Sequence, residues 1–244
     1  MKIANIYPIA NQQFYRCEEY VMILAHLVKK NLYDKKHFYD VQYIIMDNGL
    51  FEGEQVSTNL QDLIDLAETS EIPVDEIIVP DVINDLDATI ELFEKNLETI
   101  RKYNKKYRFM FVAQAATYKD LERAIDYINQ YENLELTVGI SKLSPLNRDS
   151  YFAIEQYKKC KFPIHFLGIK STLNEILRCV ECIRSCDTSQ LAFVAKNVKD
   201  ISKIEVFRYV RMGKEIDLEH DNVSNDALFD LIEAEHDEAV ALEL

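Results

Sequence analysis

Short apolar runs alternate with amphipathic stretches along most of the chain. Each run is continuous rather than alternating in polarity, which is typical of strands in a parallel sheet that is buried on both faces. The stretches between them place apolar residues at three- and four-residue steps, as one face of a helix requires. We therefore expect strands at residues 2–8, 41–49, 75–81, 108–115, 134–141 and 164–169 and a short one ending at Asp187, and helices at residues 18–30, 58–69, 84–103, 118–131, 148–159 and 172–183.

The clearest strand–helix–strand unit spans residues 163–191, where an amphipathic helix separates two short apolar strands. A unit this compact predicts a parallel crossover, so that the polar residues at its strand ends lie at one edge of the sheet. Asp187 ends the second strand. In parallel α/β proteins, that edge carries the chemistry.

Seven strands are predicted clearly, and residues 204–210 (IEVFRYV) are a candidate for the eighth. A length of 244 residues suits one large α/β domain. No glycine-rich phosphate loop is present, which disfavours an open dinucleotide-binding sheet. We therefore predict a closed (β/α)8 barrel of the TIM type over residues 1–214. An acidic tail with an amphipathic helix is expected over residues 215–244.

Most of the net negative charge lies in that tail. The whole chain carries a formal charge of −14, and residues 215–244 hold eleven Asp or Glu and no Lys or Arg. Residues 1–214 have 31 acidic and 28 basic side chains, a net charge of −3. The barrel is therefore not excluded from binding nucleic acid. Five cysteines in no secreted spacing predict a reducing cytoplasm, and no apolar run approaches the length of a membrane span.

Polar residues or glycine lie at the ends of several predicted strands. A single aspartate in such a place is commonly the N-cap of the next helix. Three acids and an amide that converge on one rim are harder to explain as caps, because crowded carboxylates raise one another's pKa and take separate roles in catalysis. The set consists of Asp47, Asp81, Gln114, Gly139 and Asp187.

Six segments, taken in order, resemble the rim motifs of the tRNA-guanine transglycosylase superfamily. The likeness is strongest to its shorter viral members, which insert 7-deazaguanines into DNA. The segments are MDNGLFE, VPDVIND, FVAQA, TVGISKLS, HFLGIKST and RSCDTS, all within residues 40–197. The resemblance implies a (β/α)8 barrel, in agreement with the pattern of strands and helices. It also implies an enzyme that exchanges guanine for a 7-deazaguanine.

The resemblance implies a role for each matching residue. Asp187 corresponds to the nucleophile, whose carboxylate forms a covalent glycosyl-enzyme intermediate, and Asp47 corresponds to the general acid/base. The partners implied are DNA, whose guanine must leave the helical stack, and a free 7-deazaguanine base. The residues assigned to the purine pocket are Asp81, Gln114, Gly139 and Gly168. Gly139 would contact the base through its backbone amide.

Two features depart from the family pattern. The chain lacks the Cys-x-Cys-x-x-Cys zinc cluster, so no metal and no cofactor is expected, and it is too short for the tRNA-binding domains of longer members. Cys179, Cys182 and Cys186 form a C-x2-C-x3-C run, but on the predicted helix this spacing is that of a core-facing stripe. His165 is expected to be a hydrogen-bonded core histidine rather than a base.

A basic stretch and the acidic tail follow the predicted nucleophile. The basic stretch is either a groove that contacts phosphates or a solvated surface. The tail either docks on a partner protein, folds back over the basic stretch, or is a disordered solubilising segment. Whether the protein is a homodimer stays open. The basic residues assigned to nucleic-acid binding are Lys196, Lys199, Lys203, Arg208 and Arg211.

Other functions stay open beside the DNA reaction. The same pocket would also suit tRNA or a free nucleotide as substrate, or hydrolysis of the glycosidic bond. A non-catalytic barrel that binds a purine or a protein is the further alternative. The pairing of Asp47 with Asp187 disfavours a binder, because binding alone does not need two carboxylates. If the protein is viral, its compartment would be the host cytoplasm.

Overall fold

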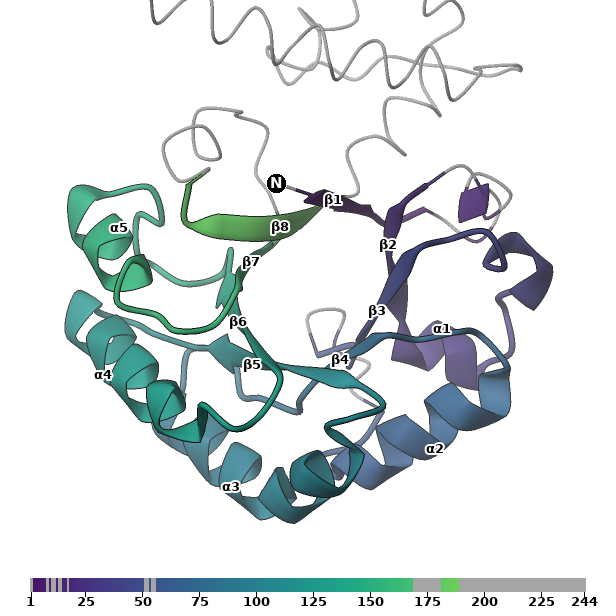
Figure 1. The fold of residues 1–244 in the computed structure, drawn as a ribbon, viewed down its shortest axis with the longest axis horizontal. Helices are drawn as coiled ribbons and strands as arrows, with labels where there is room; N and C mark the ends of the chain where they lie inside the picture. The colour runs from purple at the N-terminus through teal and green to yellow at the C-terminus, as the bar shows by residue number, and fades with distance from the viewer. Residues whose placement is uncertain are drawn as a thin grey trace, which may run out of the picture.

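The computed structural model describes residues 2–7, 9, 12, 15, 16, 18–50, 53, 56–168 and 181–188. Within them, eight parallel strands follow one another around a closed barrel, and the last strand pairs back to the first (Figure 1). The predicted (β/α)8 barrel is therefore confirmed. The strands are β1 (Lys2–Asn5), β2 (Tyr20–Leu24), β3 (Tyr43–Asp47), β4 (Glu76–Ile78), β5 (Arg108–Ala113), β6 (Leu136–Ser141), β7 (Ile164–Leu167) and β8 (Ile183–Thr188).

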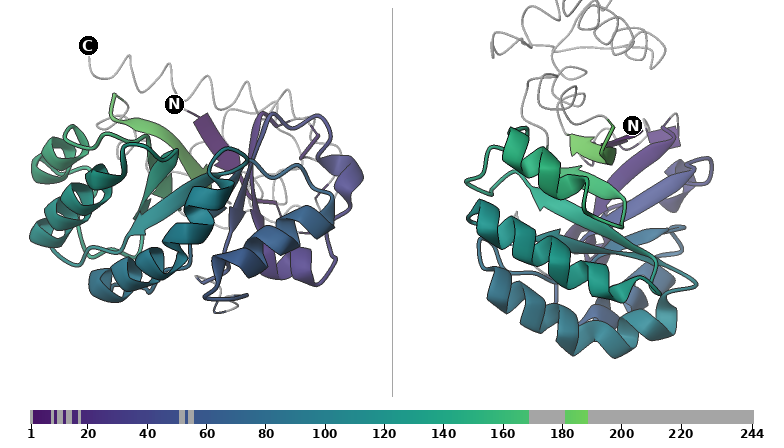
Figure 2. Two further views of the ribbon diagram at one scale, coloured as in Figure 1. Left: turned by 60° about the horizontal axis from the view of Figure 1, so that its bottom comes forward. Right: turned by 60° about the vertical axis from the view of Figure 1, so that its left-hand side comes forward.

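Helices form the outer layer of the barrel. They lie outside the strands from β2 to β7 (Figure 1), and α4 and α5 pack side by side (Figure 2). None of the described helices is long and apolar enough to cross a membrane. The described helices are α1 (Ala25–Lys29), α2 (Leu60–Ser70), α3 (Leu86–Tyr103), α4 (Tyr118–Ile128) and α5 (Tyr151–Tyr157), with 3-10 turns η2 (Lys35–His37) and η3 (Asn129–Tyr131).

The eighth strand is not the one that the sequence suggested. A single helix was predicted over residues 18–30, whereas Tyr20–Leu24 form β2, which pairs along its length with β3, and α1 covers only Ala25–Lys29. The prediction was wrong because this short apolar run fits both the helical and the buried-strand pattern. The barrel closes without residues 204–210, which lie outside the described residues, as does the tail at 215–244.

Three further boundaries differ from the prediction. Ile183 begins β8 instead of ending a helix, and residues 169–180 lie outside the described part of the chain. Asn84 has a φ of 56° and does not cap α3, because the Asp85 side chain accepts the N–H of Ala88 in that role. The helix predicted from residue 148 is α5 and starts later, at Tyr151, after the Ser150 cap.

Two apolar cores stabilise the barrel. The larger one lies between the strands and the helices, and the smaller one fills the lumen with Ala4, Met22, Ile45, Ile78, Met110 and Val112. At the amino-terminal end of the lumen, the rings of Tyr20 and Tyr43 stack with centroids 4.5 Å apart. The guanidinium of Arg184 donates to the Glu76 carboxylate at 2.7 Å beside them. Side chains therefore fill the amino-terminal end of the lumen, and a site can form only at its carboxyl-terminal end.

An aromatic cluster joins the connection between β1 and β2 to the segment between α1 and β3. Rings of Tyr7, Tyr15, Tyr33 and Phe38 contact one another there. Glu18 is buried beneath them and accepts hydrogen bonds from Asn5 Nδ2 at 2.7 Å and from the Tyr7 hydroxyl. Burial raises the pKa of Glu18, and these two donors offset part of the rise.

Candidate active site

Five of the predicted site residues lie at or just beyond the carboxyl ends of their strands. Asp47 is the last residue of β3, Gln114 follows β5, Gly168 follows β7, and Asp187 is the penultimate residue of β8. Asp81 follows β4 by three residues. Because all eight strands are parallel, these residues share one face of the barrel, where enzymes of this architecture carry their active sites.

Asp187 is held from the neighbouring strand. Its side chain is buried, with 5% of the residue exposed. The Oδ1 atom accepts the backbone N–H of Gly168 at 2.7 Å and lies 3.2 Å from His165 Nε2. Among the described residues, both hydrogen bonds to this carboxylate therefore end on one oxygen, and none ends on Oδ2.

The Gly168 N–H is aimed at Asp187 by a turn that needs glycine. Its φ is +62°, a left-handed conformation that side chains disfavour, and an added Cβ would overlap the Lys142 side chain. Arg148 fixes the same turn, donating from Nη2 to the Gly168 carbonyl at 2.9 Å and from Nη1 to the Leu167 carbonyl at 2.9 Å. Its guanidinium lies over the Phe166 ring, 4.7 Å from the centroid.

Arg148 is a site residue that the sequence did not predict. It is 4% exposed, and a further hydrogen bond joins it to the Ile140 carbonyl at 3.0 Å. One side chain thus ties the end of β6 to the end of β7. Its partners are backbone carbonyls, which carry no residue-specific mark in the sequence.

Asp81 is the centre of a buried polar network. Its Oδ1 accepts from Asn48 Nδ2 at 2.7 Å, and its Oδ2 accepts from Gln114 Nε2 at 2.5 Å. The amide oxygen of Gln114 in turn accepts the N–H of Asn84 at 3.1 Å. Burial raises the pKa of Asp81, and the hydrogen bonds from Gln114 and Asn48 hold the rise in check. The structure thus brings Asp81 and Gln114 into contact, and their assignment to a purine pocket stays a prediction.

Asn48 was also missed. It follows Asp47 directly, and its side chain donates to the Val79 carbonyl at 3.2 Å besides Asp81. The Asp47 carboxylate accepts the N–H of Gly49 at 2.9 Å, and the Asn48 amide oxygen accepts the N–H of Leu50 at 2.9 Å. These are successive Asx turns, a role that an Asp-Asn-Gly sequence favours. They fix the loop after β3 against the Asp81 network.

Gly139 was predicted at a strand end, but it lies inside β6, which continues to Ser141. It is paired with Val112 of β5 and His165 of β7. A Cβ at this position would come within 2.9 Å of Met110 Sδ and 3.1 Å of Leu167 Cδ1. Glycine at position 139 therefore leaves space for the Met110 and Leu167 side chains in the lumen. The backbone-amide contact with a base that the resemblance implies for this residue stays a prediction.

His165 is fully buried and hydrogen-bonded, as the sequence predicted for a core histidine. Its Nδ1 lies 2.8 Å from Ser185 Oγ, and its Nε2 faces Asp187. What the sequence did not reveal is that one of its partners is the candidate nucleophile.

Other predicted residues lie elsewhere. Cys186 is on β8 and Cys182 directly precedes that strand, and both pack in the outer core. The helical stripe predicted for these cysteines is therefore wrong. Cys179 lies outside the described residues. In the described part of the chain, no group of three or more His, Cys, Asp or Glu could hold a metal ion. Outside the described residues fall the basic positions Lys196, Lys199, Lys203, Arg208 and Arg211.

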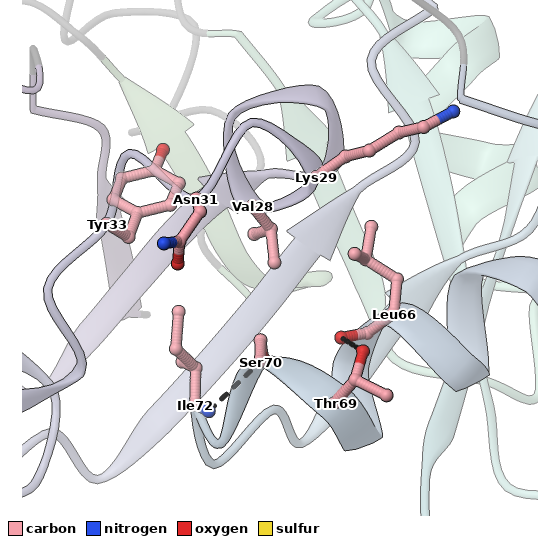
Figure 3. Close-up of a pocket in the computed structure, with 8 residues that line it drawn as sticks. All are labelled: Val28, Lys29, Asn31, Tyr33, Leu66, Thr69, Ser70 and Ile72. Atoms are coloured by element: carbon pink, nitrogen blue, oxygen red, sulfur yellow. Dashed lines mark hydrogen bonds between the residues drawn. The ribbon is translucent and has the colours of Figure 1, made fainter.

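A small cavity of about 210 Å³ lies in the helical layer (Figure 3). It is formed at the carboxyl-terminal ends of α1 and α2. Helices that follow parallel strands run back toward the amino-terminal ends of those strands, so this cavity is remote from the rim site. Its lining residues are Val28, Lys29, Asn31, Tyr33, Leu66, Thr69, Ser70 and Ile72.

Comparisons with known proteins add little to this geometry. No protein-family model matches the chain, and no curated protein matches it. Among solved structures, N-acetylneuraminate lyase from Proteus mirabilis is similar with a TM-score of 0.40 and 14% sequence identity, over 86% of this chain and 75% of the lyase. A similarity of this degree does not bear on the reaction.

Proposed function

We propose that the chain is a base-exchange transglycosylase that replaces guanine in DNA with a 7-deazaguanine. The observation that carries the proposal is the setting of Asp187: a buried rim carboxylate with Oδ1 anchored by Gly168 and His165. Oδ2 receives no hydrogen bond from the described residues. A carboxylate held in one orientation needs little reorganisation to attack a sugar carbon.

Each step of the exchange has a residue to perform it. Oδ2 of Asp187 attacks C1′ of a guanosine nucleotide, the C1′–N9 bond breaks, and its electron pair passes to the departing guanine. Asp47 supplies the proton that guanine takes up, and its carboxylate then removes a proton from the incoming 7-deazaguanine. That base attacks C1′, the bond to Asp187 breaks, and its electron pair returns to the carboxylate.

The Asp81 network suits the edge of a guanine. The base presents an acceptor at O6 and a donor at the exocyclic N2 amine. Because the Gln114 amide oxygen is occupied by Asn84 and one Nε2 proton by Asp81, Gln114 has one N–H left to donate. The Asp81 carboxylate beside it has only acceptor atoms when ionised. The pair therefore offers a donor and an acceptor side by side, and the incoming 7-deazaguanine presents the same edge.

The proposal is tested by incubating the protein with guanine-containing DNA, matched RNA and a radiolabelled 7-deazaguanine. We expect label in DNA and release of one guanine per label incorporated. Label in RNA alone would transfer the reaction to an RNA substrate, and guanine release without incorporation would indicate hydrolysis. Absence of both release and incorporation would refute the proposed reaction.

A further inference from the structure

A line of polar side chains leads to Asp187 from the amino-terminal end of the lumen. It runs from Arg184 Nε to Ser185 Oγ at 3.1 Å, from Ser185 Oγ to His165 Nδ1 at 2.8 Å, and from His165 Nε2 to Asp187 Oδ1 at 3.2 Å. Ser185 and His165 are fully buried. Buried polar groups that are joined in this way polarise one another and fix each other's orientation.

A strand irregularity makes the line continuous. Ile164 of β7 pairs with Ile183 of β8, but His165 pairs with Ser185, so Arg184 is an extra residue in β8. The shift places Ser185 opposite His165 and Asp187 two residues further on. The Arg184 guanidinium is fixed at its other side by Glu76 Oε2 at 2.7 Å and lies over the Tyr43 ring, 5.5 Å from the centroid.

If His165 is neutral, only one assignment of donor and acceptor fits all the hydrogen bonds between Arg184 and Asp187. Arginine has only donors, so Ser185 Oγ accepts from Arg184. An ionised carboxylate has only acceptors, so His165 Nε2 must carry the proton that faces Asp187. Neutral imidazole then presents a lone pair at Nδ1, and the Ser185 hydroxyl donates to it.

We propose that Arg184, Ser185 and His165 form a directed hydrogen-bond chain that positions Asp187. The proposal rests on the nucleophilic role of Asp187 given above. His165 and the Gly168 N–H keep Oδ1 as the acceptor, which leaves Oδ2 to form the bond to C1′. When that bond breaks in the second step, its electron pair returns to the carboxylate, and the same two donors stabilise the restored charge.

The direction of the chain is measured without any substrate. Nitrogen NMR of ¹⁵N-histidine-labelled protein distinguishes the two neutral tautomers from imidazolium, and His165→Gln identifies the signal. We expect the Nε2–H tautomer at pH 7 in wild type. Ser185→Ala should keep the Nε2–H tautomer, because Asp187 still accepts from Nε2, and should move the Nδ1 signal toward that of a nitrogen without a hydrogen bond, while the His37 signal stays unchanged. A wild-type Nδ1–H tautomer, or imidazolium at pH 7, would refute the proposed hydrogen-bond chain.

The positioning effect is measured by kinetics. His165→Leu has no donor for Asp187, so kcat for exchange should fall by about 10- to 100-fold at unchanged KM, the range expected for one hydrogen bond to a charged group. His165→Gln keeps an N–H and should recover part of this loss. His37→Gln, at the amino-terminal face, is the matched control. Equal kcat in His165→Leu and wild type would contradict the positioning role.

These measurements separate the two proposals. If wild type shows the Nε2–H tautomer but no base exchange, the proposed function is refuted and the hydrogen-bond chain remains as a structural feature only. If wild type exchanges bases and His165 carries its proton on Nδ1, the proposed function stands and the proposed hydrogen-bond chain is refuted.

Discussion

Replacement of Asn48 by alanine tests whether the Asp81 network is built around a buried charge. The change removes three hydrogen bonds: to the Asp81 carboxylate, to the Val79 carbonyl and from the Leu50 N–H. A hydrogen bond to a charged group contributes about 1.5–3 kcal/mol, and a neutral one about 0.5–1.5 kcal/mol. The free energy of unfolding should therefore fall by about 2.5–6 kcal/mol at a pH where Asp81 is ionised.

The loss should depend on pH in a defined direction. Burial raises the pKa of Asp81 in the folded protein, so the free energy of unfolding falls as pH rises from the unfolded value of about 3.9 through the folded value. Asn48→Ala removes a donor that lowers this pKa and extends the fall to higher pH. At a pH where Asp81 is protonated, all three lost bonds are neutral and the cost should be only about 1.5–4.5 kcal/mol.

Urea unfolding of wild type and variant at several pH values gives both numbers. Asn96 offers a matched control, because it is equally buried but bonds only to neutral backbone groups: the Leu92 and Thr58 carbonyls and the Leu60 N–H. Asn96→Ala should destabilise by the same amount at every pH. An Asn48→Ala loss that is likewise independent of pH would refute a charged Asp81 in this network.

Three further predictions concern other parts of the chain. Glu18→Gln should make the protein more stable than wild type at pH 7 and equally stable well below pH 4, because it removes a buried carboxylate whose folded pKa is raised. The Asn5 amide oxygen, which has no hydrogen-bond partner among the described residues, can accept from the new amide. Equal stability of variant and wild type at every pH of an unfolding series would contradict this prediction. Gly168→Ala should lower the free energy of unfolding by about 1–2 kcal/mol through left-handed strain and reduce exchange, and an unaffected unfolding midpoint would contradict it. A chain that ends at Lys214 should bind DNA more tightly than the full chain at low salt, with a gap that narrows as salt rises; equal affinities in an anisotropy titration would remove any electrostatic role for the tail.

The barrel and its rim were predictable because strand ends can be located in sequence. Continuous apolar runs mark buried parallel strands, and the polar residue at each end then falls on one face. That reasoning placed Asp47, Asp81, Gln114 and Asp187 at the rim. It missed β2, because an apolar run of five residues does not distinguish a buried strand from a helix face.

The contacts that orient the site were not predictable from spacing. Arg148 binds carbonyls of two strands, and any residue type supplies a carbonyl. Ser185 faces His165 only because β8 carries one extra residue at Arg184, and no residue preference marks that shift in register. Asn48 is a plain turn residue in sequence, and its bond to Asp81 follows from the pairing of β3 with β4.

The central claim is that Asp187 becomes covalently bonded to the sugar. Guanine-containing DNA mixed with the protein, without an incoming base, should give a protein–DNA adduct that survives denaturation, maps to Asp187 by mass spectrometry and disappears when guanine is added. Asp187→Asn is the matched control, since its amide oxygen can still accept from Gly168 and His165 while the nucleophile is lost. We predict an adduct in wild type and none in the variant. Base exchange without an adduct, or an adduct on another residue, would contradict the account.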